Sequence, residues 1–169
     1  MIPQPDRAEE GRVNPKGIPC LYCSTDKDTA VAEMRPWAGE FVTAKVVILR
    51  DLKVVDCSAL DKLDSATFDL ILGLNKGEPE PDKREERVWA DINRGFSQPV
   101  TRLDNVAEYA PTQVLAEAFR TDGYDGIIYG SRLGAGNNVA IFDMEAIKIG
   151  TRALYEVVEA GTPKFKEIK

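Results

Sequence analysis

The residues of this sequence that could do chemistry are an arginine, a glutamate and a serine, each within a short motif. Arg12 lies in Gly11–Gly17 (GRVNPKG), where glycine and Asn-Pro predict a turn that presents side chains into a cleft. A guanidinium there could bind a pyrophosphate through two parallel hydrogen bonds. The alternative is a solvated loop arginine, which is common on protein surfaces.

Glu33 is surrounded by mostly apolar residues in Ala30–Met34 (AVAEM). Because burying a carboxylate is costly, either this side chain lies on the exposed face of a helix or it serves a site. A carboxylate beside a ribose could hold the sugar hydroxyls and stabilise an oxocarbenium-like transition state. The sequence leaves both interpretations open.

Two further side chains and a glycine-rich loop are candidates for ligand contacts. Ser131 follows a predicted strand, and it could hydrogen-bond a glutamate and fix its rotamer, or be an ordinary turn serine. Tyr22 could stack on a planar ligand group or fill the core. Backbone amides in Gly134–Asn138 could cradle phosphates or ribose hydroxyls. This loop is not a dinucleotide-binding fingerprint, because it connects two strands rather than opening a helix.

Composition excludes several kinds of chemistry. The chain has no histidine, so Ser-His and Cys-His nucleophiles and histidine-bearing zinc sites are excluded. A net charge of -6 argues against a large nucleic-acid-binding surface. Cys20 and Cys23 are three residues apart on a predicted strand and so point to opposite faces, which favours buried structural thiols over a redox or metal pair. We therefore predict no metal site.

The overall class is a globular domain. A chain of 169 residues, 43% of them hydrophobic and 30% charged, fits a single domain spanning 1–169. No apolar run approaches the ~20 residues that span a bilayer. Met1–Glu10 lacks the apolar core of a signal peptide, so we expect a cytoplasmic protein without membrane contact.

The elements that must position these residues follow from local patterns. A strand is expected over Ile18–Ser24, followed by a helix over Lys27–Arg35 with Thr25 or Asp26 as its cap and Pro36 beyond its end. Further strands are expected over Phe41–Leu49, Val54–Cys57, Gly126–Tyr129, Asn138–Phe142 and, at a sheet edge, Leu154–Glu159. Further helices are expected over Ser65–Asn75, Arg84–Phe96 and Tyr109–Gly123, and a surface loop over Lys76–Lys83. Clusters of strands separated by helices predict an α+β (mixed α/β) fold.

Taken together, the motifs resemble those of the RES domain, a toxin family named for an arginine, a glutamate and a serine. The resemblance covers most of the chain and is weakest between Leu52 and Arg102. The matching segments are Gly11–Gly17, Leu21–Ser24, Thr29–Met34, Tyr109–Gln113, Gly123–Ser131 and Asn138–Phe142.

The resemblance implies an ADP-ribosyltransferase-like fold, with a small mixed β-sheet and helices around an NAD cleft. It implies a bacterial toxin that cleaves the nicotinamide–ribose bond of NAD, as a glycohydrolase or a phosphorylase, and depletes cellular NAD. NAD would be the substrate, with no prosthetic group. The expected partner is an Xre-type antitoxin with a helix-turn-helix domain. The alternatives are a protein ADP-ribosyltransferase and a catalytically degenerate binding domain.

The resemblance also implies a role for each site residue. Arg12 would bind the NAD phosphates, Tyr22 would line the nicotinamide side, and Glu33 would steady the ribosyl cation. Ser131 would position the substrate or the glutamate. We expect Asn138, at the start of the closing strand, to join the substrate-binding residues.

The chain departs from the family pattern at two positions. The family usually has another arginine in a strand before the Gly-Arg motif, whereas only Arg7 precedes it here, in a proline-containing stretch. Either the chain begins within the domain, so that its N-terminal part is incomplete, or this member lacks part of the site. Val13 also replaces a residue that is often aromatic in the family.

Overall fold

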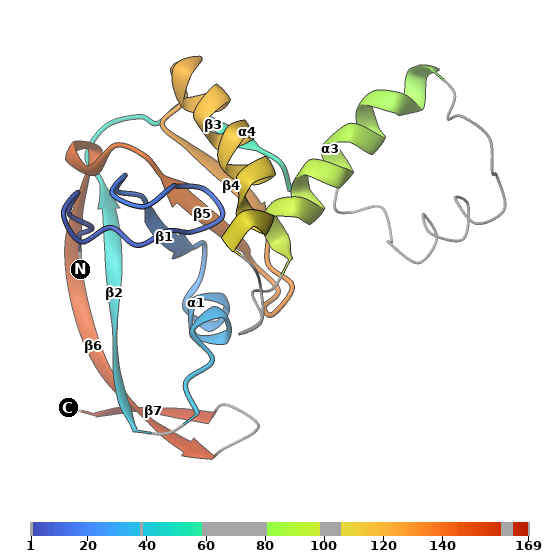
Figure 1. The fold of residues 1–169 in the computed structure, drawn as a ribbon. Helices are drawn as coiled ribbons and strands as arrows, with labels where there is room; N and C mark the ends of the chain where they lie inside the picture. Colours follow the sequence, from blue (N-terminus) through green and yellow to red (C-terminus); the bar gives the residue numbers. More distant parts are fainter. Residues whose placement is uncertain (1, 38, 59–80, 99–105, 160–163, 169) are drawn as a thin grey trace, which may run out of the picture.

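The computed structural model describes residues 2–37, 39–58, 81–98, 106–159 and 164–168 (Figure 1). The strands are β1 (Leu21–Ser24), β2 (Glu40–Ile48), β3 (Val54–Asp56), β4 (Gly126–Gly130), β5 (Asn137–Ile141), β6 (Ile147–Glu159) and β7 (Lys164–Ile168). The helices are α1 (Lys27–Met34), α3 (Pro81–Ser97) and α4 (Ala110–Thr121), with short 3-10 turns η1 (Val106–Tyr109) and η2 (Met144–Ala146). The predicted α+β class is confirmed. No helix in these ranges is long and apolar enough to cross a membrane.

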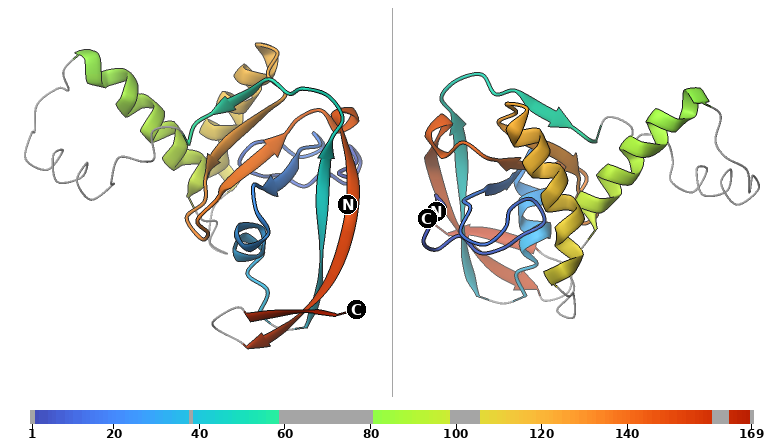
Figure 2. Two further views of the ribbon diagram at one scale, coloured as in Figure 1. Left: turned by 180° about the vertical axis from the view of Figure 1, so that it is seen from behind. Right: turned by 45° about the horizontal axis from the view of Figure 1, so that its top comes forward.

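The described strands form two sheets, of which the first is a small mixed sheet as expected. The first has the order β1-β5-β4-β3, and it is mixed because β3 and β4 are parallel while the other pairs are antiparallel. The second has the order β2-β6-β7 and is antiparallel. Figure 2 shows β2 and β6 as a long ribbon, with β7 crossing near one end of it.

The two faces of the first sheet have different partners. One face packs against α3 and α4, in a buried cluster that includes Phe96, Ala116, Ile127 and Ala140. On the opposite face Leu21 and Ile141 pack with Ile147 of β6. Side chains on a strand alternate between the two faces of the sheet. Neighbouring residues of one strand can therefore belong to different clusters, as Ala140 and Ile141 of β5 do.

The register of the first sheet creates a polar row at one end. Asn138 of β5 is the cross-strand neighbour of Ser24 on β1 and of Tyr129 on β4. Directly paired residues share a face and have Cβ atoms about 5 Å apart. Three polar side chains therefore lie side by side across three strands that are distant in sequence.

The C-terminal strand prediction was wrong in two respects. Leu154–Glu159 is only the end of β6, which begins at Ile147. It is not an edge strand, since β6 lies between β2 and β7. Gly150 and Thr151 interrupt the apolar pattern, and the first half of the strand is stabilised by its pairing with β2, which a local pattern does not reveal.

Helix boundaries were predicted to within a few residues. Asp26 caps α1 as expected, because its carboxylate accepts a hydrogen bond from the Thr29 amide at 2.8 Å. The helix ends at Met34, one residue earlier than predicted, and Arg35 takes a left-handed conformation with φ 45°. The helix predicted over Tyr109–Gly123 is confirmed as α4, which ends at Thr121, and Gly123 lies beyond that end with φ 79°.

The region between β3 and α4 differs more from the prediction. The expected helix Ser65–Asn75 lies outside the described residues, as does most of the expected loop Lys76–Lys83. The last three residues of that loop are helical, since α3 begins at Pro81, and proline suits the first turn of a helix. The predicted Arg84–Phe96 helix is confirmed as part of α3.

An ion-pair cluster ties the two sheets together at one end. Arg50, which follows β2, donates from Nη2 to Asp125 before β4 and to Asp143 after β5, each at 2.7 Å. The Lys53 amide donates to the other oxygen of Asp125 at 2.8 Å. The hydrogen bond from Arg50 is the main reason why the pKa of Asp125 falls to about 2. A lowered pKa means that the folded state favours the carboxylate.

We expect Asp125→Asn to lower the melting temperature at pH 7 by a few degrees, because the ion pair with Arg50 is lost. The stability that Asp125 contributes is complete above about pH 4 and is lost as pH falls toward about 2. The deficit of the variant relative to wild type should therefore shrink below pH 4 in thermal melts.

The matched control is Asp6→Asn. Asp6 contacts Arg7 at 3.8 Å, and both side chains are more than 70% exposed, at 73% and 81%. Exposed pairs contribute little, so this variant should melt like wild type at every pH. Equal deficits in the two variants would contradict a specific role for Asp125.

Candidate functional site

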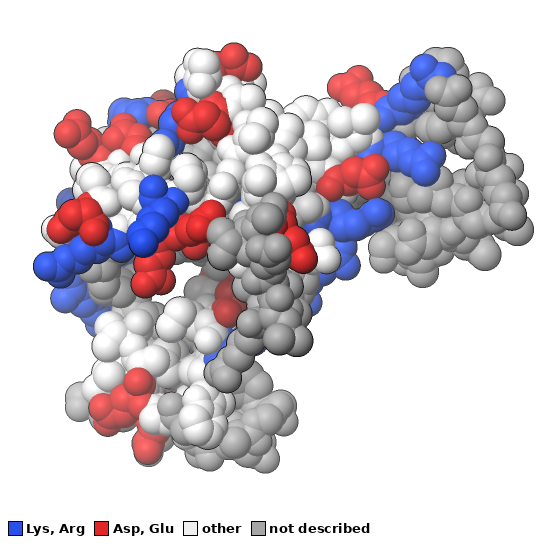
Figure 3. Space-filling view, in the orientation of Figure 1, with Lys and Arg blue, Asp and Glu red and all other residues white. Residues whose placement is uncertain are grey.

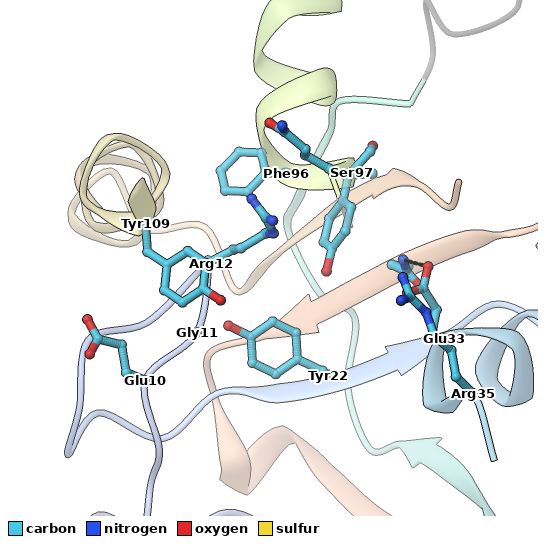
Figure 4. Close-up of a pocket in the computed structure, with 12 residues that line it drawn as sticks. Glu10, Gly11, Arg12, Tyr22, Glu33, Arg35, Phe96, Ser97 and Tyr109 are labelled. Carbon is cyan, nitrogen blue, oxygen red and sulfur yellow. Dashed lines mark hydrogen bonds between the residues drawn. The ribbon is translucent and has the colours of Figure 1, made fainter. Parts of the chain in front are cut away.

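A pocket of about 470 Å³ opens where α1, the N-terminal loop and the end of α3 come together (Figure 4). This volume is typical of small-molecule sites. The lining residues are Glu10, Gly11, Arg12, Tyr22, Glu33, Arg35, Phe96, Ser97, Gln98, Tyr109, Tyr129 and Asn138. Figure 4 shows Glu33 and Arg35 at one end, Arg12 and Tyr109 at the other, and Tyr22 between them. The structure thus brings four of the five predicted site residues to one cavity.

The fifth predicted residue, Ser131, does not line the pocket but forms a hydrogen bond with Glu33. The Ser131 hydroxyl donates to Oε1 of Glu33 at 2.6 Å, which is the contact that the sequence suggested. The amide of Asn138 donates to the same oxygen at 2.7 Å. No hydrogen bond within the described part of the chain reaches Oε2. The carboxylate is therefore fixed through one oxygen, while the other remains able to meet a ligand.

Each donor to Glu33 is itself oriented. Oγ of Ser131 accepts hydrogen bonds from the amides of Leu133 and Gly134 at 3.1 and 3.0 Å, so its own proton is directed to the glutamate. The Ser24 hydroxyl donates to Oδ1 of Asn138 at 2.9 Å, which turns the amide nitrogen of Asn138 toward Glu33. The orientation of the carboxylate thus depends on residues from β1, β5 and the loop after β4.

The glycine-rich loop after β4 packs directly on α1. The Gly136 amide donates to the Thr29 hydroxyl at 2.9 Å, and that hydroxyl donates to Asp26 at 2.8 Å. A Cβ on Gly134 would lie 2.6 Å from the Thr29 hydroxyl, and one on Gly136 would overlap the Asp26 carboxylate. Glycine is required because the loop backbone touches the start of the helix that carries Glu33.

The arginine motif is organised by a buried asparagine. Asn14 is 2% exposed, and the two N–H groups of its side chain are shared among three backbone carbonyls, of Glu9 at 2.9 Å, Pro15 at 3.2 Å and Ile18 at 2.8 Å. Its oxygen accepts the Tyr22 hydroxyl at 2.7 Å. With every polar atom satisfied, burial of the side chain is tolerated and fixes the turn.

Tyr22 is shared between this turn and the pocket. Its hydroxyl also accepts the Val13 amide at 3.0 Å, while 42% of the residue is exposed. Burial raises the pKa of Tyr22, so the phenol stays neutral. The tyrosine therefore neither fills the core nor lies free, because its polar end is fixed and its ring lines the cavity.

Arg12 is held by contacts that are not ion pairs. Its Nη1 donates to the carbonyl of Gly95 at 3.2 Å, and its guanidinium lies 5.4 Å from the ring centre of Tyr109. Gln113 of α4 fixes the backbone beside it by donating to the Gly11 carbonyl at 2.8 Å. No carboxylate among the described residues pairs with Arg12, so its charge is available to an anion. The alternative of a freely solvated loop arginine does not apply.

Sequence reasoning missed several lining residues. Phe96 and Tyr109 reach the pocket from α3 and η1, and Tyr129 from β4. Arg35 adds a second guanidinium beside Glu33, through the left-handed backbone that ends α1. An arginine directly before Pro36 and two residues after a candidate glutamate was a signal for this position.

The cysteines belong to the core, not to the pocket. Cys20 packs in the cluster under α3 and α4, whereas Cys23 packs against the cluster facing β6. Burial raises the pKa of Cys20 to about 12 and that of Cys23 to about 11, which disfavours reactive thiolates. Within the described ranges no three Cys, Asp or Glu residues are grouped to hold a metal ion.

Surface charge is mixed. On the face in Figure 3, acidic and basic side chains alternate over the described surface rather than gather into one basic area. This agrees with the acidic net charge of -6. Within the pocket, the cationic side chains are those of Arg12 and Arg35.

The RES domain model matches residues 2–158, and the chain therefore belongs to the RES domain family. The matched range includes every site residue described above. No curated protein matches the chain at a significant level.

We expect Asn138→Asp to destabilise the protein at pH 7, because it replaces a donor 2.7 Å from Oε1 of Glu33 with a second carboxylate. Two adjacent carboxylates raise one pKa of the pair, and the repulsion disappears as pH falls through that raised value. Thermal melts should show a deficit of a few degrees at pH 7 that shrinks toward pH 4.

The matched control is Asn137→Asp, one residue earlier on β5 and on the opposite face. The side chain of Asn137 makes no hydrogen bond in the described part of the chain. This variant has the same charge change and should keep the wild-type pH dependence. A pH-independent deficit in Asn138→Asp would argue against contact with Glu33.

Proposed function

We propose that this RES domain cleaves the bond between nicotinamide and ribose in NAD, and that it acts as a toxin by depleting NAD. The observation that carries the proposal is the geometry of Glu33. Its carboxylate is fixed through one oxygen by Ser131 and Asn138, and Glu33 lines a cavity that has Arg12 at its far end.

The geometry suits a reaction in which positive charge develops on a sugar. When the bond from the ribose carbon to the nicotinamide nitrogen breaks, the electron pair leaves with nicotinamide, which becomes neutral. The ribose carbon becomes cationic, and the fixed carboxylate of Glu33 would stabilise it without reorganising. Water then adds to that carbon and loses a proton to solvent, or inorganic phosphate adds through an ionised oxygen that carries no proton.

Arg12 and Tyr22 would hold the dinucleotide on either side of this step. The guanidinium of Arg12 lacks a carboxylate partner in the described structure, so it can bind the pyrophosphate. The exposed ring of Tyr22 lies between Arg12 and Glu33 in Figure 4, where it can pack against nicotinamide or its ribose. Because Arg12 would bind the pyrophosphate and Tyr22 the nicotinamide side, the bond to be cleaved would be held in one orientation beside Glu33.

A toxin of this kind needs a neutralising partner. We propose an Xre-type antitoxin that places a carboxylate or its C-terminus against Arg12, since an arginine in an open cleft binds such groups well. Blocking that end of the cavity would exclude the pyrophosphate of NAD. The support for a partner is family membership and the accessible guanidinium.

The test is nicotinamide release from NAD by the purified chain, with and without inorganic phosphate. We expect release by wild type and a loss of at least about a hundredfold in Glu33→Gln, since a fixed charge that stabilises the transition state is removed. Acceleration by phosphate would identify phosphorolysis, and its absence hydrolysis. Labelled ADP-ribose on a protein would identify the transferase alternative.

The matched control is Glu117→Gln on α4, where the side chain is 58% exposed and pairs with Arg120 at 3.9 Å. It should release nicotinamide at the wild-type rate. A folded wild-type chain that neither binds nor consumes NAD would leave the degenerate-domain alternative. Full activity in Glu33→Gln would rule out the assigned role of the carboxylate.

A further inference from the structure

Tyr129 combines burial with an unpartnered polar atom. The residue is 6% exposed, and its ring packs on Phe96 with ring centres 5.8 Å apart. Its hydroxyl makes no hydrogen bond to any residue in the described part of the chain. Buried phenol hydroxyls normally find a partner, because desolvation without one is costly.

The missing partner lies on the cavity side. Among the described residues, no fully enclosed side-chain nitrogen or oxygen lacks a hydrogen-bond partner. The Tyr129 hydroxyl is therefore not sealed inside the protein, and the open space that this residue lines is the pocket. We therefore infer that the Tyr129 hydroxyl faces the pocket, where a ligand could accept its hydrogen bond.

The position of Tyr129 within the pocket is set by strand register. It pairs across β4 and β5 with Asn138, the residue that orients Glu33. Its pKa is raised by burial first and by the Glu33 carboxylate second, while Arg12 opposes the shift. The phenol is thus neutral and lies within the electrostatic reach of both the carboxylate and the guanidinium.

A neutral phenol between these two groups suits one part of a dinucleotide. Glu33 accepts hydrogen bonds from the ribose, and Arg12 binds phosphate, but Arg12 already uses one N–H for Gly95 and one face for Tyr109. A phosphate oxygen accepts several strong hydrogen bonds and needs further donors. The Tyr129 hydroxyl is a donor that the protein does not otherwise use.

We propose that the Tyr129 hydroxyl donates a hydrogen bond to the phosphate on the nicotinamide-ribose side of the substrate. This inference rests on NAD being the substrate. The tyrosine then acts as a binding residue that recognises a phosphorylated ribose and places its sugar against Glu33. It contributes equally before and during bond cleavage, because the phosphate does not change in the reaction.

The experiment compares Tyr129→Phe with wild type, using NAD as substrate and ADP as competitive inhibitor. ADP keeps both phosphates and lacks the nicotinamide ribose. We expect KM for NAD to rise roughly tenfold or more with kcat nearly unchanged, and the inhibition constant of ADP to rise by a similar factor. The melting temperature should stay at the wild-type value, since the hydroxyl has no protein partner to lose.

The matched control is Tyr22→Phe, which removes the phenol hydroxyl of another tyrosine that lines the pocket. That hydroxyl bonds Asn14 at 2.7 Å and the Val13 amide at 3.0 Å, so its loss should lower the melting temperature. The contrast between the two variants separates a ligand contact from a structural one.

Three results would overturn the inference. Unchanged KM and ADP inhibition in Tyr129→Phe would remove it while leaving the proposed function intact. A rise in KM without weaker ADP inhibition, or the absence of ADP inhibition in wild type, would place the contact on the ribose instead. Failure of wild type to bind or cleave NAD would end the proposed function and this inference with it.

Discussion

Two hydrogen bonds that converge on Oε1 of Glu33 are the interaction on which the rest of the site depends. They come from Ser131 and Asn138, which are 98 and 105 residues away in sequence. For both donors to reach one oxygen, β5 must pair with β1 and β4 in the observed register, and the glycine-rich loop must pack on α1. An exposed glutamate ordinarily samples several rotamers, and each of these constraints removes some of that freedom. The pairing of the strands in the first sheet therefore fixes the orientation of the Glu33 carboxylate.

At the opposite end of the pocket, the guanidinium of Arg12 is likewise held in place by the surrounding fold. Asn14 closes the N-terminal turn, because its two side-chain N–H groups are shared among three backbone carbonyls and its oxygen accepts the Tyr22 hydroxyl. Gly11 permits this arrangement, since a Cβ there would lie 2.5 Å from the Tyr22 hydroxyl. The turn then directs Arg12 toward α3 and η1, where a carbonyl and an aromatic ring hold the guanidinium without neutralising it. A carboxylate partner would have given a stronger contact and a weaker anion site.

Local sequence patterns predicted the parts of this arrangement that depend on neighbouring residues. Asp26 as a cap, a helix that ends close to Gly123 and a turn around Arg12 all follow from residues a few positions apart. The contact between Ser131 and Glu33 was also predicted, as one of two alternatives, and family resemblance strengthened it. Patterns failed where pairing across the chain decides the structure. The first half of β6 forms because β2 pairs with it, and Arg35 enters the pocket through a torsion angle that no sequence pattern specifies.

Within the described structure, the polar groups divide into those that the fold satisfies and those that it does not. Asn14, Ser131 and Asn138 have their hydrogen-bonding capacity directed to protein partners, and they form the scaffold. The second oxygen of Glu33, the charge of Arg12 and the hydroxyl of Tyr129 lack such partners, and all three residues line one cavity. These groups face solvent in the pocket, so a ligand can bind them without first breaking a hydrogen bond within the described protein. A ligand that presents hydroxyls to the carboxylate and anionic oxygens to the guanidinium and the phenol would satisfy all three, as the proposed ribose joined to phosphate would.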